Sequence, residues 1–569
     1  MKSNGQGALI IQSDLTVLLD ERMPLAEQAR ELLLACADAV KRAGVIHTYR
    51  ITPMTVWNAL SSGMNISRIV DGLAGHARHE VPVKAAAALR LWAERYGSLK
   101  LVSRGEKLIV QGEEGLLERL SAQPAVRGWM KDGATDGERE LLPSFRGAFK
   151  QELARQGYPV LDQAGYHEGE ALTVSLKPKS AGGGAFALRD YQREAVDRFV
   201  RSGGVQGGSG VVVLPCGTGK TVVGIAALAE LGTAALVLTP NETSARQWRS
   251  ELLDKTTLDE GQIGIYCGSR REVRPVTIAT YNLMTRRRTD TEDYPHMKLF
   301  SERDWGLIVY DEVQLLPAPV FRMTATLQAT RRLGLTATLV REDGCAEDVY
   351  SLIGPKLYDM NWRTAEEQHY ISSVRCAEIR LPLHGAEAAK YESSGPRTKL
   401  RIAAENPSKL AVAEQLLERH KGKPALVIGQ YLNQLNEAAR RLNAPLLTGE
   451  VPQPERQRLY ERFKSGEIGV IVVSKVANLA VDLPDAAVAI QLSGSFGSRQ
   501  EEAQRIGRLL RPKRGSNEAW FYSLVTDGTK ETEFALKRQM FMLEQGYRYE
   551  LLRGAEGGAA SRDEGEGVR

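Results

Sequence analysis

The chain has 569 residues, of which 43% are hydrophobic and 25% are charged. This length suffices for roughly three or four domains, and the composition is ordinary for a globular protein. No apolar run approaches the ~20 residues that a membrane span requires, and no charged-then-apolar leader opens the chain. We therefore expect a cytoplasmic protein with no membrane partner. The net charge of +5 suits a polyanionic partner without identifying one.

Cysteine and histidine give no sign of a metal site. The five cysteines are far apart and form no C-x-x-C pair, so neither a zinc ribbon nor a disulfide framework is expected; they are Cys36, Cys216, Cys267, Cys345 and Cys376. His76 and His79 have helical i, i+3 spacing, but no third ligand accompanies them.

The order of apolar and breaker residues predicts several domains. Residues 8–20 read as two short strands broken by Asp14, and residues 25–40 have helical spacing. Residues 175–187 contain proline and three consecutive glycines, which indicates a linker. We expect an N-terminal accessory domain, a second accessory segment with the linker, two α/β lobes, and a disordered tail rich in glycine and charge, at 1–130, 131–186, 187–365, 366–550 and 551–569.

The stretch 211–227, VVVLPCGTGKTVVGIAA, predicts a strand, a phosphate-binding loop and a helix. Gly217 and Gly219 permit a tight turn whose backbone N–H groups surround a β-phosphate, and the helix N-terminus adds further donors. Lys220 reaches the β- and γ-phosphates, while the hydroxyl of Thr221 suits Mg²⁺. The full pattern has glycine at position 214, where this chain has leucine. An ordinary strand-to-helix turn is the alternative.

Further nucleotide contacts are expected before this loop. Gln192, in LRDYQ, presents a donor and an acceptor that match the N6 and N7 edge of adenine. The full predicted ATP-binding set is Arg189, Gln192, Pro215, Cys216, Gly217, Thr218, Gly219, Lys220 and Thr221.

The stretch 305–316, WGLIVYDEVQLL, predicts a buried strand that ends in two carboxylates. Ligands of open α/β sheets lie at the carboxyl ends of the strands. Asp311 can hold Mg²⁺ through water, and Glu312 can polarise the water that attacks the γ-phosphate. A surface turn is the alternative for an isolated Asp-Glu pair.

Two more strands, at 236–240 and 276–284, end in polar residues. Such side chains suit hydrogen bonds to a phosphate backbone, although helix capping is their commoner role. The later stretch RLGLTATLV places Thr336 and Thr338 where they can link the nucleotide site to a moving part.

The second half alternates strands and helices from residue 424 onward, which predicts another parallel sheet. It ends in SRQEEAQRIGRLLRPK, where Gln504, Arg508 and Arg511 recur on one helical face. Arginine forks onto phosphate oxygens, so this face can close over a γ-phosphate bound by the first lobe. A basic solvated face is the alternative.

These segments together resemble superfamily 2 helicases. LRDYQ, LPCGTGKT, LVLTP, IATYNLM, DEVQ, LTATLV and QRIGRLLR occur in the order of that superfamily, from Leu188 to the 540s. Arg341-Glu342-Asp343 is similar to the RED element of XPB-type DNA repair helicases, and the N-terminal region also looks like that of bacterial members. The family usually has histidine in DEVH, where this chain has Gln314.

The resemblance implies two tandem RecA-like lobes that use ATP and Mg²⁺ to move 3′ to 5′ on DNA, working at the nucleoid. Strand contacts are expected from Ser244, Arg246, Thr280 and Ser474. It also implies a possible partner nuclease or repair factor. Three alternatives remain: a double-strand translocase that does not unwind, an RNA helicase, and a scaffold with a vestigial ATPase.

The charged tripeptide Arg341, Glu342 and Asp343 directly follows LTATLV and so leaves the sheet edge. We expect it to act as a wedge that holds a DNA fork open. A salt-bridged turn that only caps the lobe is the alternative.

Overall fold

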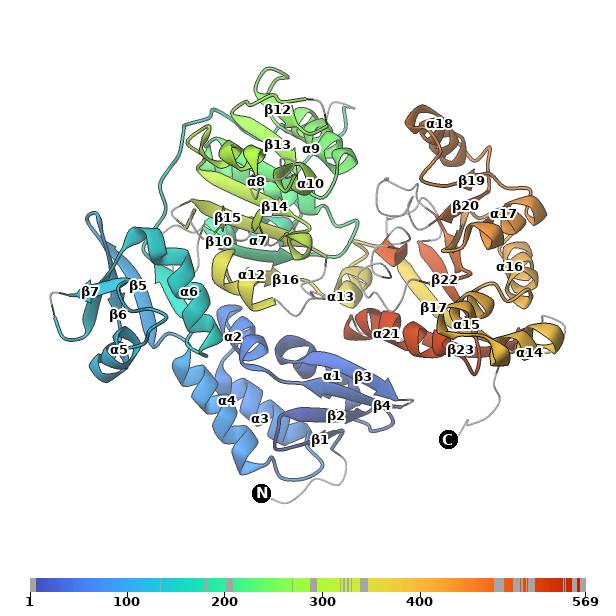
Figure 1. Cartoon of the computed structure of the whole chain (residues 1–569), viewed down its shortest axis with the longest axis horizontal. Coiled ribbons are helices and arrows are strands. Elements are labelled where there is room, and N and C mark those ends of the chain that lie inside the picture. Colours follow the sequence, from blue (N-terminus) through green and yellow to red (C-terminus); the bar gives the residue numbers. More distant parts are fainter. Residues whose placement is uncertain are drawn as a thin grey trace. The chain divides into compact units, whose positions relative to one another are not determined.

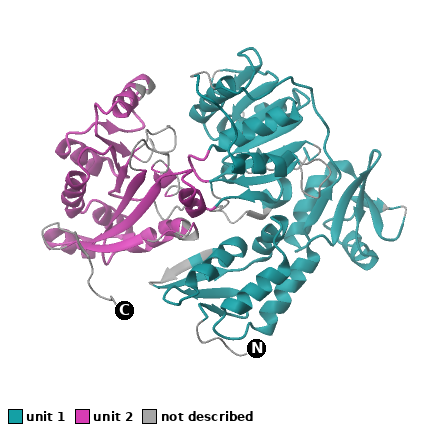
Figure 2. Ribbon diagram, turned by 180° about the vertical axis from the view of Figure 1, so that it is seen from behind, with its two compact units in different colours: residues 1–214, 219–360 teal, residues 215–218, 361–569 magenta. Residues whose placement is uncertain are grey.

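The computed structural model divides the chain into two compact units, residues 1–214 with 219–360 and residues 215–218 with 361–569 (Figure 2). The structure describes residues 7–43, 45–133, 135–179, 183–200, 208–268, 270–286, 294–317, 319–320, 323–324, 327–328, 330–337, 346–474, 486–494, 502, 505–507, 509, 517–545, 547, 549–554 and 560–562.

The first unit begins with a four-stranded antiparallel sheet in the order β1-β2-β4-β3. Its strands and the helices that follow are β1 (Leu9–Ile11), β2 (Thr16–Asp20), β3 (Asp38–Ala43), β4 (Ile46–Arg50), α1 (Ala26–Cys36), α2 (Pro53–Ser61), α3 (Ile66–His76) and α4 (Val83–Arg95). The two predicted strands on either side of Asp14 are confirmed. The helix expected over 25–40 ends earlier, because the chain after Cys36 pairs with β4.

A second small sheet of five strands follows, in the order β7-β8-β6-β5-β9. Its elements are β5 (Leu99–Arg104), β6 (Lys107–Gln111), β7 (Met130–Asp132), β8 (Glu138–Leu141), β9 (Val160–Gln163), α5 (Glu114–Ser121) and α6 (Arg146–Arg155). Leu99, Leu101, Phe149 and Leu153 are fully buried in its core. This sheet and the first one form the N-terminal α+β region that the sequence predicts.

Helix α6 is joined to the next part of the first unit by buried charges. Arg146 and Lys150 both bind Asp162, at 2.7 and 3.0 Å. Lys150 Nζ also donates to Gln328 Oε1 at 2.9 Å. Because an unpaired buried charge is costly, this cluster fixes how α6 packs on that part.

The rest of the first unit is a parallel sheet of seven strands, in the order β12-β13-β11-β14-β15-β10-β16 (Figure 1). The strands are β10 (Ser209–Val213), β11 (Ala235–Thr239), β12 (Ile263–Tyr266), β13 (Val276–Thr280), β14 (Leu307–Asp311), β15 (Arg331–Thr336) and β16 (Lys356–Asp359). The helices include α7 (Asp190–Val200), α8 (Lys220–Leu231), α9 (Glu242–Lys255), α10 (Tyr281–Met284) and α12 (Ala346–Leu352). Strands buried on both faces explain the continuous apolar runs.

The register of this sheet brings distant segments to one edge. Asp311 pairs with Leu335, Val213 pairs with Thr336, and Thr239 pairs with Thr280. The five central strands therefore all end at the same level. Polar residues that follow each strand meet there, as expected for a ligand-binding edge.

The second unit contains an eight-stranded sheet in the order β19-β20-β18-β21-β22-β17-β23-β24, parallel except for the last strand. Its strands are β17 (Ser373–Leu381), β18 (Ala425–Gly429), β19 (Leu446–Leu447), β20 (Val470–Ser474), β21 (Val488–Gln491), β22 (Glu518–Thr526), β23 (Tyr549–Gly554) and β24 (Ala560–Arg562). The helices include α13 (Trp362–Glu367), α14 (Gly385–Ser393), α15 (Pro396–Ala404), α16 (Ser408–Arg419), α17 (Leu432–Arg441), α18 (Gln453–Lys464) and α21 (Lys530–Glu544). The predicted class, two tandem RecA-like parallel-sheet lobes after an α+β region, is confirmed.

Two local expectations differ from the structure. The strand expected over 276–284 ends at Thr280, and Tyr281–Met284 form a helical turn. The segment from 551 contains the end of β23, which pairs with β17, and the antiparallel β24. A strand at a sheet edge needs backbone pairing rather than an apolar pattern, so composition gives little sign of it. No helix in the described ranges is long and apolar enough to cross a membrane.

Candidate nucleotide and DNA site

The phosphate-binding loop follows β10 as the sequence predicts. Gly217 and Gly219 have φ of 85° and 84°, a left-handed conformation that disfavours other residues. Helix α8 begins directly after Gly219, at Lys220. Thr218 is buried, and its hydroxyl donates to the carbonyl oxygen of Pro215 at 2.7 Å. The loop thus has the local geometry that a phosphate requires.

Leu214 explains the departure from the full glycine pattern. Its side chain is fully buried, and its backbone N–H donates to Thr336 O at 2.9 Å. Position 214 therefore extends the sheet edge and does not belong to the left-handed part of the loop. Leucine is compatible with that role, because only positive φ or a close backbone approach demands glycine.

Gln192 lies against the phosphate-binding loop. Its side chain is buried, and its Oε1 accepts a hydrogen bond from the backbone N–H of Arg189 at 3.0 Å. A Cβ atom at Gly219 would lie only 2.7 Å from Gln192 Nε2. The glycine is therefore needed for two reasons, its positive φ and the closeness of the glutamine amide.

The two predicted carboxylates lie at the end of β14. Glu312 has a φ of 51°, which turns the chain sharply after Asp311. Glu312 Oε1 lies 3.6 Å from Lys220 Nζ. The structure thus brings together side chains that are 92 residues apart in the sequence, which no surface turn would do.

Asp311 has a partner that sequence reasoning missed. The indole N–H of Trp248, on α9, donates to Asp311 Oδ2 at 3.0 Å. Burial, and after it the charge of Glu312, raise the pKa of Asp311 to about 6 even though the Trp248 hydrogen bond and Lys220 oppose the shift. A Cβ atom at Gly224 of α8 would lie 2.5 Å from the Trp248 ring, so this glycine makes room for the indole.

Tyr281 is a second residue at this site that the sequence does not predict. Its hydroxyl donates to the backbone oxygen of Asp311 at 2.9 Å, and its side chain is buried. The sequence signal for Trp248 was its spacing, since Ala245, Trp248 and Leu252 form the buried face of α9. No sequence signal named the partner, because that depends on the strand order.

Gln314 connects the end of β14 to the end of β15. Its Nε2 donates to Glu312 Oε2 at 2.7 Å, and its Oε1 accepts from the hydroxyl of Thr336 at 2.6 Å. The side chains of Gln314 and Thr336 are buried. Lys220, Glu312, Gln314 and Thr336 therefore form one polar chain across the sheet edge.

The residues expected to contact DNA differ in exposure. Arg246 is exposed and pairs with Glu242 at 2.7 Å, while Ser244 lies in the first turn of α9, where its backbone N–H is capped by Asn241. Thr280 ends β13 and Ser474 ends β20, and both side chains are buried. Their contact with DNA remains a prediction from the sequence.

Several predicted residues lie outside the described ranges. They are Gln504, Arg508 and Arg511 of the second lobe, the tripeptide Arg341-Glu342-Asp343, and Thr338. Their roles remain predictions from the sequence.

His76 ends α3, and no group of three potential His, Cys, Asp or Glu metal ligands occurs in the described part of the chain.

Three family models match the chain. The model described as ERCC3/RAD25/XPB C-terminal helicase matches residues 365–564, and Type III restriction enzyme, res subunit, matches residues 185–341. The model described as Helicase conserved C-terminal domain matches residues 9–132. Together the matches extend over both lobes and the N-terminal region.

Curated relatives match over almost the whole chain. The chain is 48% identical to a "DNA 3'-5' helicase XPB" of Kineococcus radiotolerans, over 96% of each protein. It is 46% identical to a protein of the same name from Mycobacterium tuberculosis, over 97% of this chain and 98% of that protein. It is 30% identical to the "General transcription and DNA repair factor IIH helicase/translocase subunit XPB/SSL2" of Saccharomyces cerevisiae, over 95% and 72%. The chain therefore belongs to the XPB family of DNA helicases.

Proposed function

We propose that this protein is an ATP-dependent 3′–5′ DNA helicase that couples ATP hydrolysis to strand separation in DNA repair. The observation that supports it most directly is the polar chain from Lys220 through Glu312 and Gln314 to Thr336. Such a chain connects a phosphate-binding lysine to the end of a neighbouring strand. A change at the γ-phosphate can then reach the rest of the lobe.

The phosphate-binding loop and Gln192 would hold ATP. The loop supplies backbone N–H donors, Lys220 supplies a positive charge for the β- and γ-phosphates, and Gln192 suits the adenine edge. Arg189, Pro215, Cys216 and Thr218 complete the predicted binding set. In the second lobe, Gln504, Arg508 and Arg511 remain the predicted contacts of the γ-phosphate.

The oxygen ligands fit a Mg²⁺ ion. Thr221 follows Lys220 at the start of α8, and Asp311 is a partly buried carboxylate at the same sheet edge. Hydroxyl, carboxylate and phosphate oxygens are the ligands that Mg²⁺ prefers. When bound, the ion would neutralise charge on the phosphates of ATP.

Glu312 is placed to act as the general base. Its carboxylate is shared by Lys220 and Gln314, which fix its two oxygens in different directions. A γ-phosphate entering beside Lys220 would compete with Glu312 for the ammonium group. Glu312 would then be free to take a proton from the attacking water.

DNA is the proposed polymer substrate, as a single strand and at a fork. Ser244, Arg246, Thr280 and Ser474 remain the proposed strand contacts, and Arg341, Glu342 and Asp343 the proposed wedge. We further propose that the protein works at the nucleoid, with a nuclease or repair factor as a possible partner.

The yeast relative is named a "helicase/translocase" subunit, which favours one further candidate, a double-strand translocase that does not unwind. The decisive experiment measures ATPase rate without nucleic acid, with single-stranded DNA, with duplex DNA and with RNA, and strand separation on a duplex with a 3′ tail. DNA-stimulated ATPase with separation supports the helicase. Stimulation by duplex without separation supports the translocase. Equal stimulation by RNA, or none by any polymer, contradicts the proposal.

A further inference from the structure

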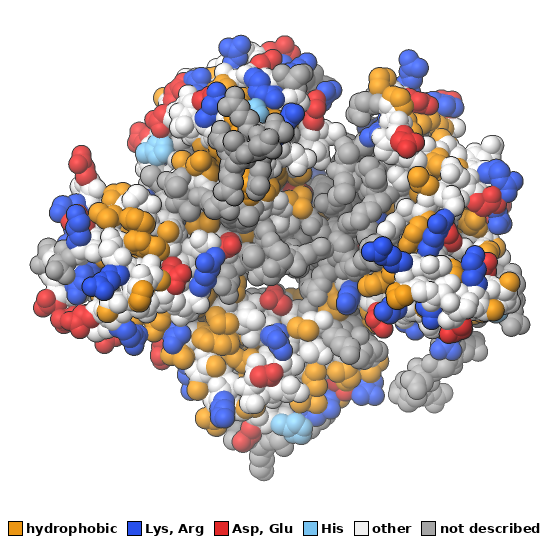
Figure 3. Space-filling view, in the orientation of Figure 1, with side chains coloured by type: hydrophobic (Ala, Val, Ile, Leu, Met, Phe, Trp, Pro, Cys, Tyr) orange, Lys and Arg blue, Asp and Glu red, His pale blue; other side chains and the backbone are white. Residues whose placement is uncertain are grey.

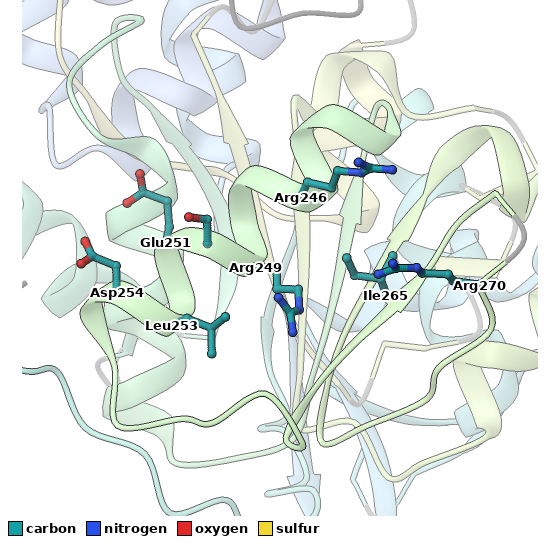
Figure 4. A pocket seen from close by; sticks show the side chains of 8 residues that line it. Arg246, Arg249, Glu251, Leu253, Asp254, Ile265 and Arg270 are labelled. Carbon is teal, nitrogen blue, oxygen red and sulfur yellow. The ribbon is translucent and has the colours of Figure 1, made fainter. Parts of the chain in front are cut away.

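A groove runs along α9 beside the edge strand β12. Its cavity has a volume of about 570 Å³, and Arg246, Arg249 and Arg270 are among the residues that line it (Figure 4). We refer to it as the α9 groove. Arg249 and Arg270 were not among the residues expected to bind DNA.

The three arginines come from two segments and face the same space. Arg246 and Arg249 are one helical turn apart on α9, whereas Arg270 follows the end of β12. Figure 4 shows the Arg270 side chain extending toward Ile265, with Arg249 to the left and Arg246 above them. Figure 3 shows Lys and Arg side chains, with Asp and Glu side chains among them, at the top of the view, where Figure 1 places α9 and β12.

The existing ion pairs leave these arginines available. Arg246 pairs with Glu242 at 2.7 Å, and both side chains are about half exposed or more. Arg249 lies 3.4 Å from Glu260, whose side chain is 77% exposed. Exposed pairs of this kind contribute roughly 0–1 kcal/mol, so an incoming anion can displace the carboxylates.

The opposite end of the groove is not strongly acidic, although Glu251 and Asp254 line it. Lys255 pairs with both of them, at 2.6 and 2.8 Å. Figure 4 shows their carboxylates directed away from the three guanidinium groups. The local charge at the arginine end is therefore positive.

The lining indicates which ligand class fits. Leu253 and Ile265 are the only aliphatic side chains among its lining residues within the described part of the chain, so the groove lacks the apolar walls of a small-molecule pocket. Planar guanidinium groups fork onto phosphate oxygens and suit a phosphodiester backbone. The groove also begins at Arg246, which the sequence already predicts to touch a strand.

We propose that the α9 groove binds the phosphodiester backbone of DNA, with Arg249 and Arg270 as contacts beyond Arg246. This inference rests on the proposed function, because it extends the path of the DNA on the first lobe. The groove binds one stretch of backbone without reading bases, so its contribution does not depend on sequence.

The test measures equilibrium binding of a fluorescent single-stranded oligonucleotide by full-length protein at several salt concentrations. Arg249→Ala and Arg270→Ala should each weaken binding about tenfold, the size of a lost hydrogen bond to a charged group. Each should also reduce the slope of log K against log[salt] by roughly 0.7, the value for one phosphate contact on a single strand. Arg249→Lys keeps the charge and should retain most of the slope.

A substitution that is expected to tighten DNA binding provides a second test. Glu260→Gln removes the carboxylate that competes for Arg249, so it should tighten DNA binding by about twofold or more. Arg271→Ala is the matched control. Arg271 is the neighbour of Arg270 and equally charged, but its guanidinium donates to the backbone oxygens of Gly268 and Arg270, and it does not line the groove.

The outcomes separate this inference from the proposed function. If wild-type protein binds no DNA, the proposed function itself fails. If wild-type protein binds DNA, and the variants Arg249→Ala and Arg270→Ala bind it with the same affinity, the α9 groove does not contact the DNA. An equal loss of DNA affinity in Arg271→Ala would show a general effect of positive charge and would contradict DNA binding by the α9 groove. Heat of binding for inorganic phosphate that disappears in Arg249→Ala, with unchanged DNA affinity, would make it a small-anion site and also overturn the inference.

Discussion

Gln314 accepts a hydrogen bond from the hydroxyl of Thr336 at 2.6 Å while its amide donates to Glu312 at 2.7 Å. One buried side chain thus holds the proposed general base and the end of the neighbouring strand at the same time. This is the position where the family usually has histidine. The glutamine amide has both a donor and an acceptor, so it can bind both partners at once.

Gln314→Leu should uncouple hydrolysis from DNA. The variant keeps the approximate volume but leaves Glu312 and Thr336 without this connection. Losing a hydrogen bond to a charged group costs about 1.5–3 kcal/mol, so we expect DNA-stimulated kcat to fall by roughly tenfold or more. Steady-state ATPase with saturating DNA checks this.

Thr336→Val tests whether the connection acts as one unit. It breaks only the strand end of the chain, and the double variant with Gln314→Leu should be little worse than Gln314→Leu alone. Gln314→His, with two ring nitrogens, should retain more activity than Gln314→Leu. Fully additive losses would mean that the two residues act independently.

Trp248→Phe should weaken the use of Mg²⁺. Phenylalanine stays aromatic and apolar but removes the N–H that orients Asp311, together with the outer ring atoms of the indole that lie against Gly224. The Mg²⁺ concentration for half-maximal ATPase should rise about tenfold, the size of a lost hydrogen bond to a charged group.

Trp305→Phe is the matched control for this variant. Trp305 is equally buried, and its indole N–H donates to the backbone oxygen of Leu299 at 2.9 Å. The Trp305→Phe variant is expected to leave the Mg²⁺ dependence of the ATPase unchanged. The same shift in both variants would mean that the effect reflects a loss of stability and not the orientation of Asp311.

Lys220→Ala should abolish ATP hydrolysis, because the γ-phosphate loses its principal positive partner. Glu312→Gln should retain ATP binding but not turnover, since the amide cannot accept the proton of the attacking water. Nucleotide binding and single-turnover hydrolysis separate the two effects. Wild-type turnover by either variant would contradict the site assignment.

Arg341→Ala combined with Glu342→Ala should separate unwinding from hydrolysis. Opening a base pair costs on the order of 1.4 kcal/mol of stacking per step, and a charged wedge would hold the fork open. Most DNA-stimulated ATPase should remain while strand separation on a tailed duplex is lost. If the two activities fall together, the tripeptide belongs to coupling or folding; if neither falls, the translocase gains support.

The free energy of unfolding of the first unit should rise with pH in the alkaline range, because Lys150 loses its proton in the folded protein. Burial, together with the charges of Arg332 and Arg146, lowers the pKa of Lys150 to about 8, although Asp162 opposes the shift. Below about pH 8 the lysine is charged in both states, and the cost of burying the charge is fully present. Between about pH 8 and 10.5 the folded protein has released a proton that the unfolded chain still holds, so stability rises with pH.

The comparison with Lys150→Met isolates this contribution. The thermal midpoint of wild type relative to the variant should rise between pH 7.5 and 9.5, while Asp162 keeps Arg146 as its partner in both proteins. A difference that is constant over this range would show that Lys150 does not lose its proton there.

Local sequence patterns predict the elements and most of the candidate site. Apolar runs that end in glycine or in carboxylates predict parallel strands with a ligand-binding edge, because strands buried on both faces need continuous hydrophobicity. The phosphate-binding loop, Asp311, Glu312 and Thr336 were all found this way. Their signals are local, since each depends on residues close together in the chain.

Which of these residues contact one another depends on the packing of the whole lobe. Trp248 and Asp311 are 63 residues apart, and their hydrogen bond exists because β11 and β14 are neighbours in the sheet. Gln314 reaches Thr336 because β14 and β15 pair in parallel with Asp311 opposite Leu335. Strand order and register come from packing over the whole lobe, so a local pattern can name a buried polar residue but cannot name its partner.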